Sequence, residues 1–208
     1  MINKKFMIFN GEKYNWCDKN NTRWIHGFLA LCIFVGHFVN YLGLFAGTTL
    51  GSILASSLTI FVGLFFFFSG YGLYTSYKSI GGGYIKSFTK RRFLPFYINY
   101  VILILFYLIV SLLLGNSFDF ITFIKSFFIG GSYVSNGWYI QTLLLFYLFY
   151  LLVFILKISN RKKIILMTLL TILYWVIFYI FNLRGFWIVS IFLFPLGMIY
   201  SEFEDKIK

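Results

Sequence analysis

Carboxylates are scarce in this sequence: only 6 of the 208 residues are Asp or Glu, and charged residues of both signs make up 12%. A soluble domain carries about 25% charged and about 45–50% apolar residues, whereas this chain is 60% apolar with a mean hydropathy of +0.84. A single soluble core cannot bury that much apolar surface. The composition therefore excludes a soluble enzyme, a DNA-binding domain and a disordered tail, and it predicts a multi-spanning membrane protein in a lipid bilayer.

Cysteine and histidine are also rare, with two of each. Cys17 and Cys32 cannot form a disulfide framework, and two histidines are too few for a histidine-rich metal site, so we expect no metal. All six carboxylates fall outside the long apolar runs. This placement excludes an intramembrane Ser-His-Asp triad and argues against a carboxylate proton relay or a cation-coupling site.

Long apolar runs, by contrast, are abundant, and a membrane helix needs about 20 such residues. Six runs qualify, at residues 24–46, 53–74, 93–114, 138–156, 164–181 and 186–200. A further run, 118–129, contains Lys125 and is predicted to be an interfacial helix or a re-entrant segment. The sequence thus predicts an all-α fold: one membrane domain, 1–208, with about six spanning helices.

The distribution of basic residues predicts the orientation of these spans. The net charge is +12, and the Lys and Arg residues form short clusters between apolar runs, as in proteins that follow the positive-inside rule. With a cytoplasmic N-terminal segment, 1–23, only Lys125 and Arg184 fall in the outer loops. We therefore expect a multi-pass plasma-membrane protein with both termini in the cytoplasm and no nucleic-acid partner.

Few polar side chains lie within the predicted spans. His37 is at membrane depth in the first span, where desolvation would keep it neutral and able to act as a general base. His26 is eleven residues earlier, so it shares a helix face with His37 about 16 Å away, and Arg23 lies about one turn beyond His26. The alternative is a packing histidine bonded to a neighbouring helix. The other polar side chains in the spans are Asn40, Asn99 and Gln141.

Two further motifs allow both a structural and a functional interpretation. Small residues such as Ser69-Gly70, near the end of the second span, let helices approach closely. The basic cluster Lys86–Arg92, expected to form a cytoplasmic loop, is typical of a topology anchor. Alternatively, Lys90 and Arg92 bind the phosphates of an anionic cytoplasmic ligand, a task to which Arg is well suited.

Four motifs in this order together resemble the acyltransferase-3 family of polytopic membrane acyltransferases. Its marks are a basic residue about ten positions before a histidine in the first span, a Phe-rich run ending in Ser-Gly in the second, a basic motif with Pro opening the third, and Trp-Tyr opening a later span. In this chain they correspond to His26 with Gly36-His37-Phe38, Phe65–Tyr71, Lys90–Tyr97 and Gly137–Ile140. Pro195-Leu196-Gly197 near the end is also similar to the family.

The resemblance implies transfer of an acyl group, usually acetyl, from cytoplasmic acyl-CoA to a hydroxyl of an envelope or exported carbohydrate. It makes His37 the catalytic histidine, and it places Lys90 and Arg92 on the CoA side. The residues expected to contact the donor, acetyl-CoA, are Arg23, His26, Ser69, Lys90 and Arg92, and those expected to contact the acceptor are Asn40 and Trp138.

Family members usually have about ten spans, so six spans indicate a short or truncated member, or one that a partner subunit completes. Two other functions are compatible with the residues themselves. One is a transporter or flippase for a small or lipid-linked solute, and the other is a non-catalytic fragment of a larger membrane enzyme.

Overall fold

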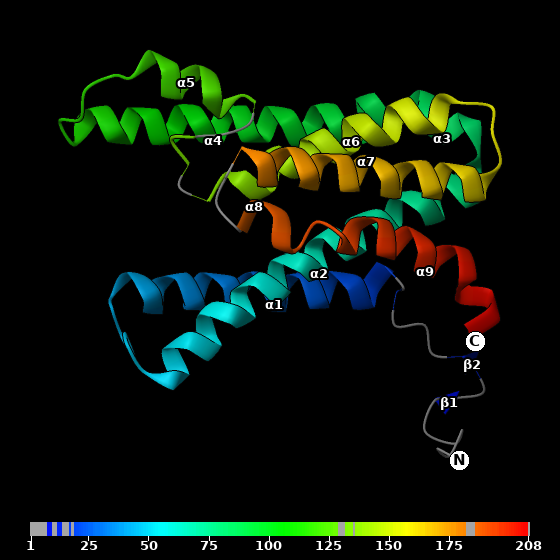
Figure 1. Cartoon of the computed structure of the whole chain (residues 1–208), viewed down its shortest axis with the longest axis horizontal. Helices are drawn as coiled ribbons and strands as arrows, with labels where there is room; N and C mark the ends of the chain where they lie inside the picture. The colour runs from blue at the N-terminus through cyan, green and yellow to red at the C-terminus, as the bar shows by residue number, and fades with distance from the viewer. Residues whose placement is uncertain are drawn as a thin grey trace. The chain divides into compact units, whose positions relative to one another are not determined.

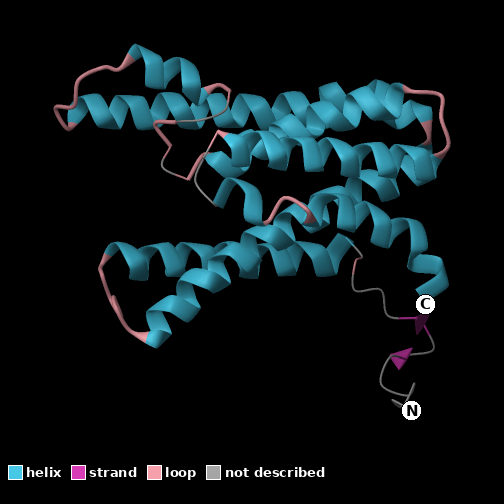
Figure 2. Ribbon diagram, in the orientation of Figure 1, coloured by secondary structure: helices cyan, strands magenta, loops and turns pink. Residues whose placement is uncertain are grey.

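Nearly all of the described chain is helical in the computed structural model of the protein (Figures 1 and 2). The structure describes residues 8–9, 12–13, 17, 19–128, 132–134, 136–181 and 186–207. Near the N-terminus, β1 (Ile8–Phe9) pairs antiparallel with β2 (Glu12–Lys13). The helices are α1 (Lys19–Tyr41), α2 (Thr49–Ile80), α3 (Gly82–Phe88), the π-helical turn η2 (Thr89–Phe93), α4 (Leu94–Leu113), α5 (Phe120–Ser126), α6 (Trp138–Ile155), α7 (Asn160–Ile180), α8 (Phe186–Val189) and α9 (Leu193–Ile207). The predicted all-α fold is confirmed.

Within the described residues, five helical segments are long and apolar enough to cross a membrane. They are Asn20–Tyr41, Thr49–Ile80, Gly82–Leu113, Trp138–Ile155 and Asn160–Ile180, and each overlaps one of the first five predicted spans. The sixth predicted span, 186–200, contains a turn at residues 190–192 that separates α8 from α9. The arrangement is consistent with about six spans. Lys4, Lys5, Arg184 and Lys208, which contribute to the predicted orientation, lie outside the described residues, so the orientation stays a prediction.

The predicted loop before the third span is helical, which corrects its expected start at Phe93. The helices α3, η2 and α4 follow one another as a single helical segment, Gly82–Leu113. Lys and Arg are good helix formers, and no Gly or Pro lies between Gly83 and Pro95 to end the helix. Pro95 follows the π-helical turn, at the second position of α4.

The chain divides into two compact units, 1–61 and 62–208, and α2 passes from the first into the second. In the first unit, a tight turn joins α1 to α2. Gly43, Phe45 and Gly47 have positive φ angles of 66°, 64° and 74°, which ends α1 earlier than the predicted limit at residue 46. The Thr48 hydroxyl then accepts a hydrogen bond from the Gly51 amide at 3.1 Å and caps the start of α2. That a single membrane domain spans 1–208 stays a prediction.

The second unit has an aromatic core between α2, α3, α6, α7 and α9. Its fully buried large aromatic side chains include Phe66, Tyr74, Phe88, Phe146, Tyr150 and Phe194. The helices α2 and α9 cross closely, because a Cβ on Gly70 would lie 2.0 Å from the carbonyl oxygen of Phe194 and one on Gly197 would lie 2.1 Å from that of Phe67. Gly70 therefore has the close-packing role that the sequence predicted.

The interfacial segment predicted at residues 118–129 forms the short helix α5. Asp119 caps it by accepting a hydrogen bond from the Ile121 amide at 3.0 Å. The side chain of Gln141, on α6, binds the last carbonyls of α5. Its Nε2 donates to the carbonyl oxygens of Lys125 at 3.2 Å and Ser126 at 3.1 Å. Carbonyls at a helix C-terminus lack partners within the helix, so Gln141 holds α5 against α6 and has a structural role.

Candidate functional site

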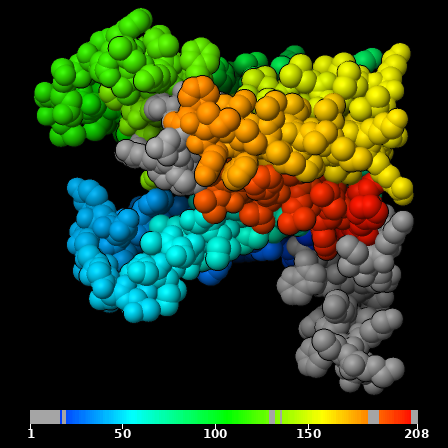
Figure 3. Space-filling model, in the orientation of Figure 1, coloured from blue at the N-terminus to red at the C-terminus, as the bar shows by residue number. Residues whose placement is uncertain are grey.

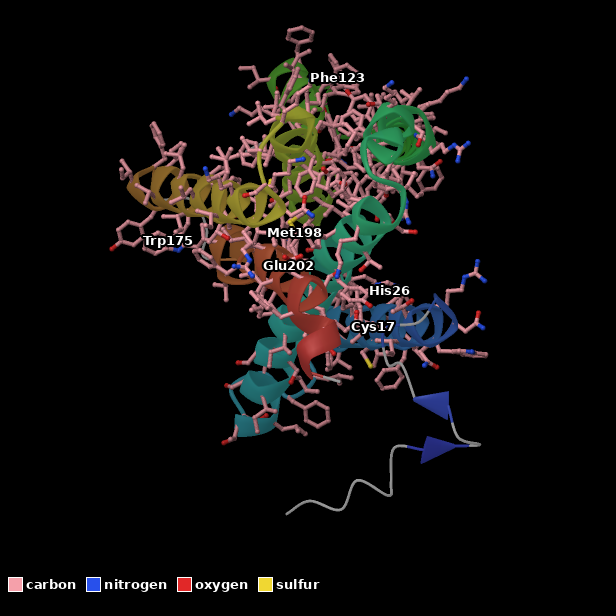
Figure 4. The ribbon with its side chains drawn as sticks, turned by 90° about the vertical axis from the view of Figure 1, so that its right-hand side faces the viewer. Cys17, His26, Phe123, Trp175, Met198 and Glu202 are labelled. Atoms are coloured by element: carbon pink, nitrogen blue, oxygen red, sulfur yellow. The ribbon has the colours of Figure 1, made fainter. Side chains whose placement is uncertain are left out.

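His37 lies on α1 in the first unit, and this helix is continuous from Lys19 to Tyr41. His26 (Figure 4) and His37 are both half-buried, and Arg23 and Asn40 are exposed. Because no break interrupts α1, the helical geometry places His26 and His37 on one face, about 16 Å apart. The structure thus keeps three of the predicted residues, His37, His26 and Arg23, along one helix.

Gly36, next to His37 on α1, lies against the side chain of Leu58 on α2. A Cβ on Gly36 would lie 2.3 Å from Cδ2 of Leu58, so only glycine fits there without moving that side chain. A pocket of about 320 Å³ opens nearby, lined by Gly36 and Asn40 of α1, by the turn and by Ser52 of α2. Asn40 therefore lies at a pocket of ligand size, one helical turn from His37.

Ser69 belongs to the second unit, where its side chain lies close enough to two tyrosines of α6 to interact with them. The partners are Tyr139 and Tyr147. Tyr139 also packs edge-on against Phe66, with 4.9 Å between ring centroids. Trp138, half-buried at the first position of α6, packs edge-on against Tyr139. The second-span motif and the Trp-Tyr motif, far apart in the sequence, are thus in direct contact.

Lys90 and Arg92 lie in the π-helical turn η2, and both are exposed. Single π-helical turns within α-helices are frequent at functional sites. Arg92 is close enough to Tyr147 for the two side chains to interact electrostatically. Tyr147 therefore interacts with a residue of the second-span motif and with one of the basic motif, both in the second unit.

A family model described as an acyltransferase domain matches residues 21–208 of the chain. The chain belongs to the acyltransferase-3 family. The resemblance drawn from the four motifs is confirmed, and together with the apolar helices it makes this protein a membrane acyltransferase. No curated protein and no solved structure matches the chain.

Tyr147 of the acyltransferase was not identified as a site residue from the sequence, because it lies within an apolar run and matches none of the four motifs. The available signal was chemical: a tyrosine hydroxyl within a membrane span requires a hydrogen-bond partner. Tyr147 is buried against the rings of Phe88, at 5.5 Å, and Phe96, at 5.7 Å. Those contacts fix the ring, so its hydroxyl is held near Ser69.

Lys163 of the acyltransferase differs from the expectation that Lys and Arg residues lie in short clusters between the apolar runs. It lies in the first turns of α7 and is only 4% exposed. Its ammonium group donates to the Tyr77 hydroxyl at 2.5 Å and lies 4.5 Å from the centre of that ring. Aromatic faces attract a desolvated cation, so Lys163 joins α7 to α2 and α6 and does not form part of an exposed basic cluster.

Among the described residues of the acyltransferase, no group of three or more His, Cys, Asp or Glu side chains is placed to hold a metal ion. Asn99, one of the polar side chains in the predicted spans, is exposed on α4 in the second unit. The roles of His37, Asn40, Ser69, Lys90 and Arg92 in binding or catalysis remain predictions.

Proposed function

We propose that the protein transfers an acyl group, acetyl in particular, from acyl-CoA on the cytoplasmic side to a hydroxyl of an envelope or exported carbohydrate at the plasma membrane. The observation that carries this proposal is the match to the acyltransferase family model over residues 21–208. The termini are proposed to be cytoplasmic, as the basic residues indicate.

His37 acts as the general base of this reaction. Its neutral imidazole accepts the proton of the acceptor hydroxyl while the hydroxyl oxygen attacks the thioester carbonyl carbon. A new C–O ester bond forms, the C–S bond breaks, and the leaving CoA thiolate takes up the proton from the His37 imidazolium, which restores the neutral base. The site needs no carboxylate for this sequence of steps, in agreement with the absence of Asp and Glu from the six predicted spans.

The donor is held by basic and hydroxyl side chains. Lys90 and Arg92 bind its phosphates, since a guanidinium can form two parallel hydrogen bonds to one phosphate. This role is supported by the exposure of both side chains. Ser69 contacts the donor from the second span, and Arg23 and His26 contribute from α1.

The acceptor is bound by Asn40 and Trp138. Support for Asn40 comes from the pocket of about 320 Å³ that it lines in the first unit. Amide and backbone groups that converge on such a pocket are suited to sugar hydroxyls, which both donate and accept hydrogen bonds. Trp138 offers an amphipathic ring with one donor, at the first position of α6.

The test is transfer of radiolabelled acetyl from acetyl-CoA to envelope material in membranes that contain the full chain. His37→Gln is compared with wild type and with Cys32→Ala, a control change at a half-buried position of the same helix. Expression and membrane insertion are matched. We expect His37→Gln to lose about 100-fold or more of the rate, as is usual when a general base is removed, and Cys32→Ala to keep it. Equal rates in all three proteins would eliminate His37 as the base.

A further inference from the structure

The helices α7 and α9 lie side by side in the second unit and run in opposite directions (Figures 1 and 3). Between them is a groove of about 350 Å³, within the size range of ligand sites. Its walls are apolar: Ile165 and Leu169 on α7 face Ile199 and Phe203 on α9. Ile165 is 58% and Leu169 54% exposed, so the groove is open along one side of the helix pair.

One end of the groove carries two opposite charges. Arg161, in the first turn of α7, and Glu202, near the end of α9 (Figure 4), both line it. Arg161, Ile165 and Leu169 are spaced four residues apart, so they form one stripe about 12 Å long. The charged end therefore continues directly into the apolar part of the groove.

Neither charge is explained by the stability of its own helix. A cation in the first turn opposes the helix dipole, and Ser159, the N-cap of α7, makes no side-chain hydrogen bond to the helix. Backbone amides of that turn, together with the Arg161 guanidinium, are suited to an anion such as a phosphate. The Glu202 carboxylate is held in place because Oε2 accepts a hydrogen bond of 2.7 Å from the buried Tyr74 hydroxyl.

We propose that this groove binds a phospholipid whose headgroup carries both a phosphate and a primary ammonium. The phosphate binds Arg161, the ammonium donates to the Glu202 carboxylate, and an acyl chain lies along Ile165, Leu169, Ile199 and Phe203. A basic surface alone would favour an anionic lipid. The carboxylate at the same end repels an anionic headgroup that lacks an ammonium, and it gives the site its selectivity. This binding site goes beyond the proposed acyl transfer and does not depend on it.

The probe is the full-length protein reconstituted in nanodiscs with equal amounts of phosphatidylethanolamine, phosphatidylcholine and phosphatidylglycerol of the same acyl chains. The lipids retained after extraction in mild detergent are identified by native mass spectrometry. We expect phosphatidylethanolamine to be enriched about fivefold over each of the others, the ratio that one interaction of about 1 kcal/mol supplies. Equal retention of the three lipids, or preferential retention of phosphatidylglycerol, would overturn the proposal.

Two charge variants assign the headgroup contacts. Arg161→Gln is expected to abolish the enrichment, and Lys157→Gln, an exposed basic residue in the preceding loop, to preserve it. Glu202→Gln is expected to raise phosphatidylglycerol to the level of phosphatidylethanolamine. Its control is Glu204→Gln, which neutralises a carboxylate outside the groove that accepts an equivalent hydrogen bond, from Tyr71. Unchanged enrichment in Arg161→Gln or Glu202→Gln would contradict the assignment.

A steric variant tests whether the lipid acyl chain lies in the groove, without changing a charge. Ile165→Trp fills the groove and is expected to reduce retained lipid about fivefold, whereas Ile172→Trp, at an exposed position of α7 outside the groove, leaves it unchanged. Ile165→Cys tests whether a second copy of the chain, and not a lipid, covers the groove. A disulfide-linked dimer formed in high yield from this variant would show that a second copy of the chain covers the groove, and would overturn the lipid proposal.

Discussion

The side chains of Tyr147 and Ser69 lie close enough to interact. This contact joins α6 to the Ser-Gly motif of α2, and the electrostatic interaction of Tyr147 with Arg92 extends it to the basic motif of η2. One buried tyrosine thus links two motifs that the sequence presents as separate. If Ser69 and Arg92 bind the acyl donor, Tyr147 is a positioning residue for both.

Tyr147→Phe removes this link and keeps the ring. We expect the KM for acetyl-CoA to rise about fivefold with little change in kcat, because the hydroxyl interaction, worth about 1 kcal/mol, orients the donor contacts. The measurement is initial acetyl transfer rates over a range of acetyl-CoA concentrations. Tyr150→Phe is the matched control, since that hydroxyl bonds only weakly, at 3.4 Å, to the Leu73 carbonyl. Identical KM values for the two variants would refute a positioning role.

Gly36→Ala tests whether the packing of α1 on α2 supports His37. The new methyl group would lie 2.3 Å from Leu58 Cδ2, the end of a side chain that can shift, so we expect a destabilisation of no more than about 1 kcal/mol and a severalfold loss of transfer activity. Adding Leu58→Ala to Gly36→Ala should restore part of the stability and part of the transfer activity, because it removes the clashing atoms. Thermal unfolding in detergent and transfer rates are measured for the single and double variants. Gly27→Ala, where the methyl group meets nothing within 4 Å, is the control.

Gly70→Ala tests the crossing of α2 and α9. A methyl group there would lie 2.0 Å from the Phe194 carbonyl oxygen, and backbone cannot move aside as a side chain can. We expect a loss of unfolding free energy of about 2–3 kcal/mol, measured as a lower Tm. Gly72→Ala, two residues along the same helix and without atoms within 4 Å, should instead stabilise by up to about 1 kcal/mol through helix propensity. A Gly70→Ala protein as stable as Gly72→Ala would disprove the close approach.

The stabilisation of α5 by its N-cap, Asp119, should depend on pH. The hydrogen bond from the Thr122 hydroxyl, followed by the Ile121 amide bond, lowers the pKa of Asp119 below its ordinary value of 3.8. A carboxyl whose folded pKa is lowered stabilises the fold fully above its unfolded pKa. The contribution is then lost as the pH falls below 3.8 through the folded pKa. We expect the amides of α5 to lose protection from hydrogen exchange in that range, after correction for intrinsic rates, and to lack it at all pH values in Asp119→Ala. Protection that is independent of pH in wild type would contradict a capping carboxylate.

The sequence by itself determined the membrane-helical class and the family. Apolar runs of about 20 residues can satisfy their backbone in a bilayer only as helices, so five of the predicted spans were recognisable without any tertiary information. His37, Ser69, Arg92 and Trp138 were recognisable because each belongs to a motif with fixed local spacing. The predicted limits of the helices were less accurate. The basic residues between Lys86 and Arg92 indicated a loop by their charge, but Lys and Arg are good helix formers and this segment is helical.

Only the tertiary structure decided which of these residues meet. The contact of Ser69 with Tyr147, the burial of Lys163 under the Tyr77 ring and the capping of α5 by Gln141 all join segments distant in sequence. A hydropathy pattern reports that a side chain lies in a span, but it does not report which neighbouring helix the side chain faces. That choice depends on close packing at particular glycines, such as Gly70 against Phe194, because there the helix backbones approach and set the rotation of each helix.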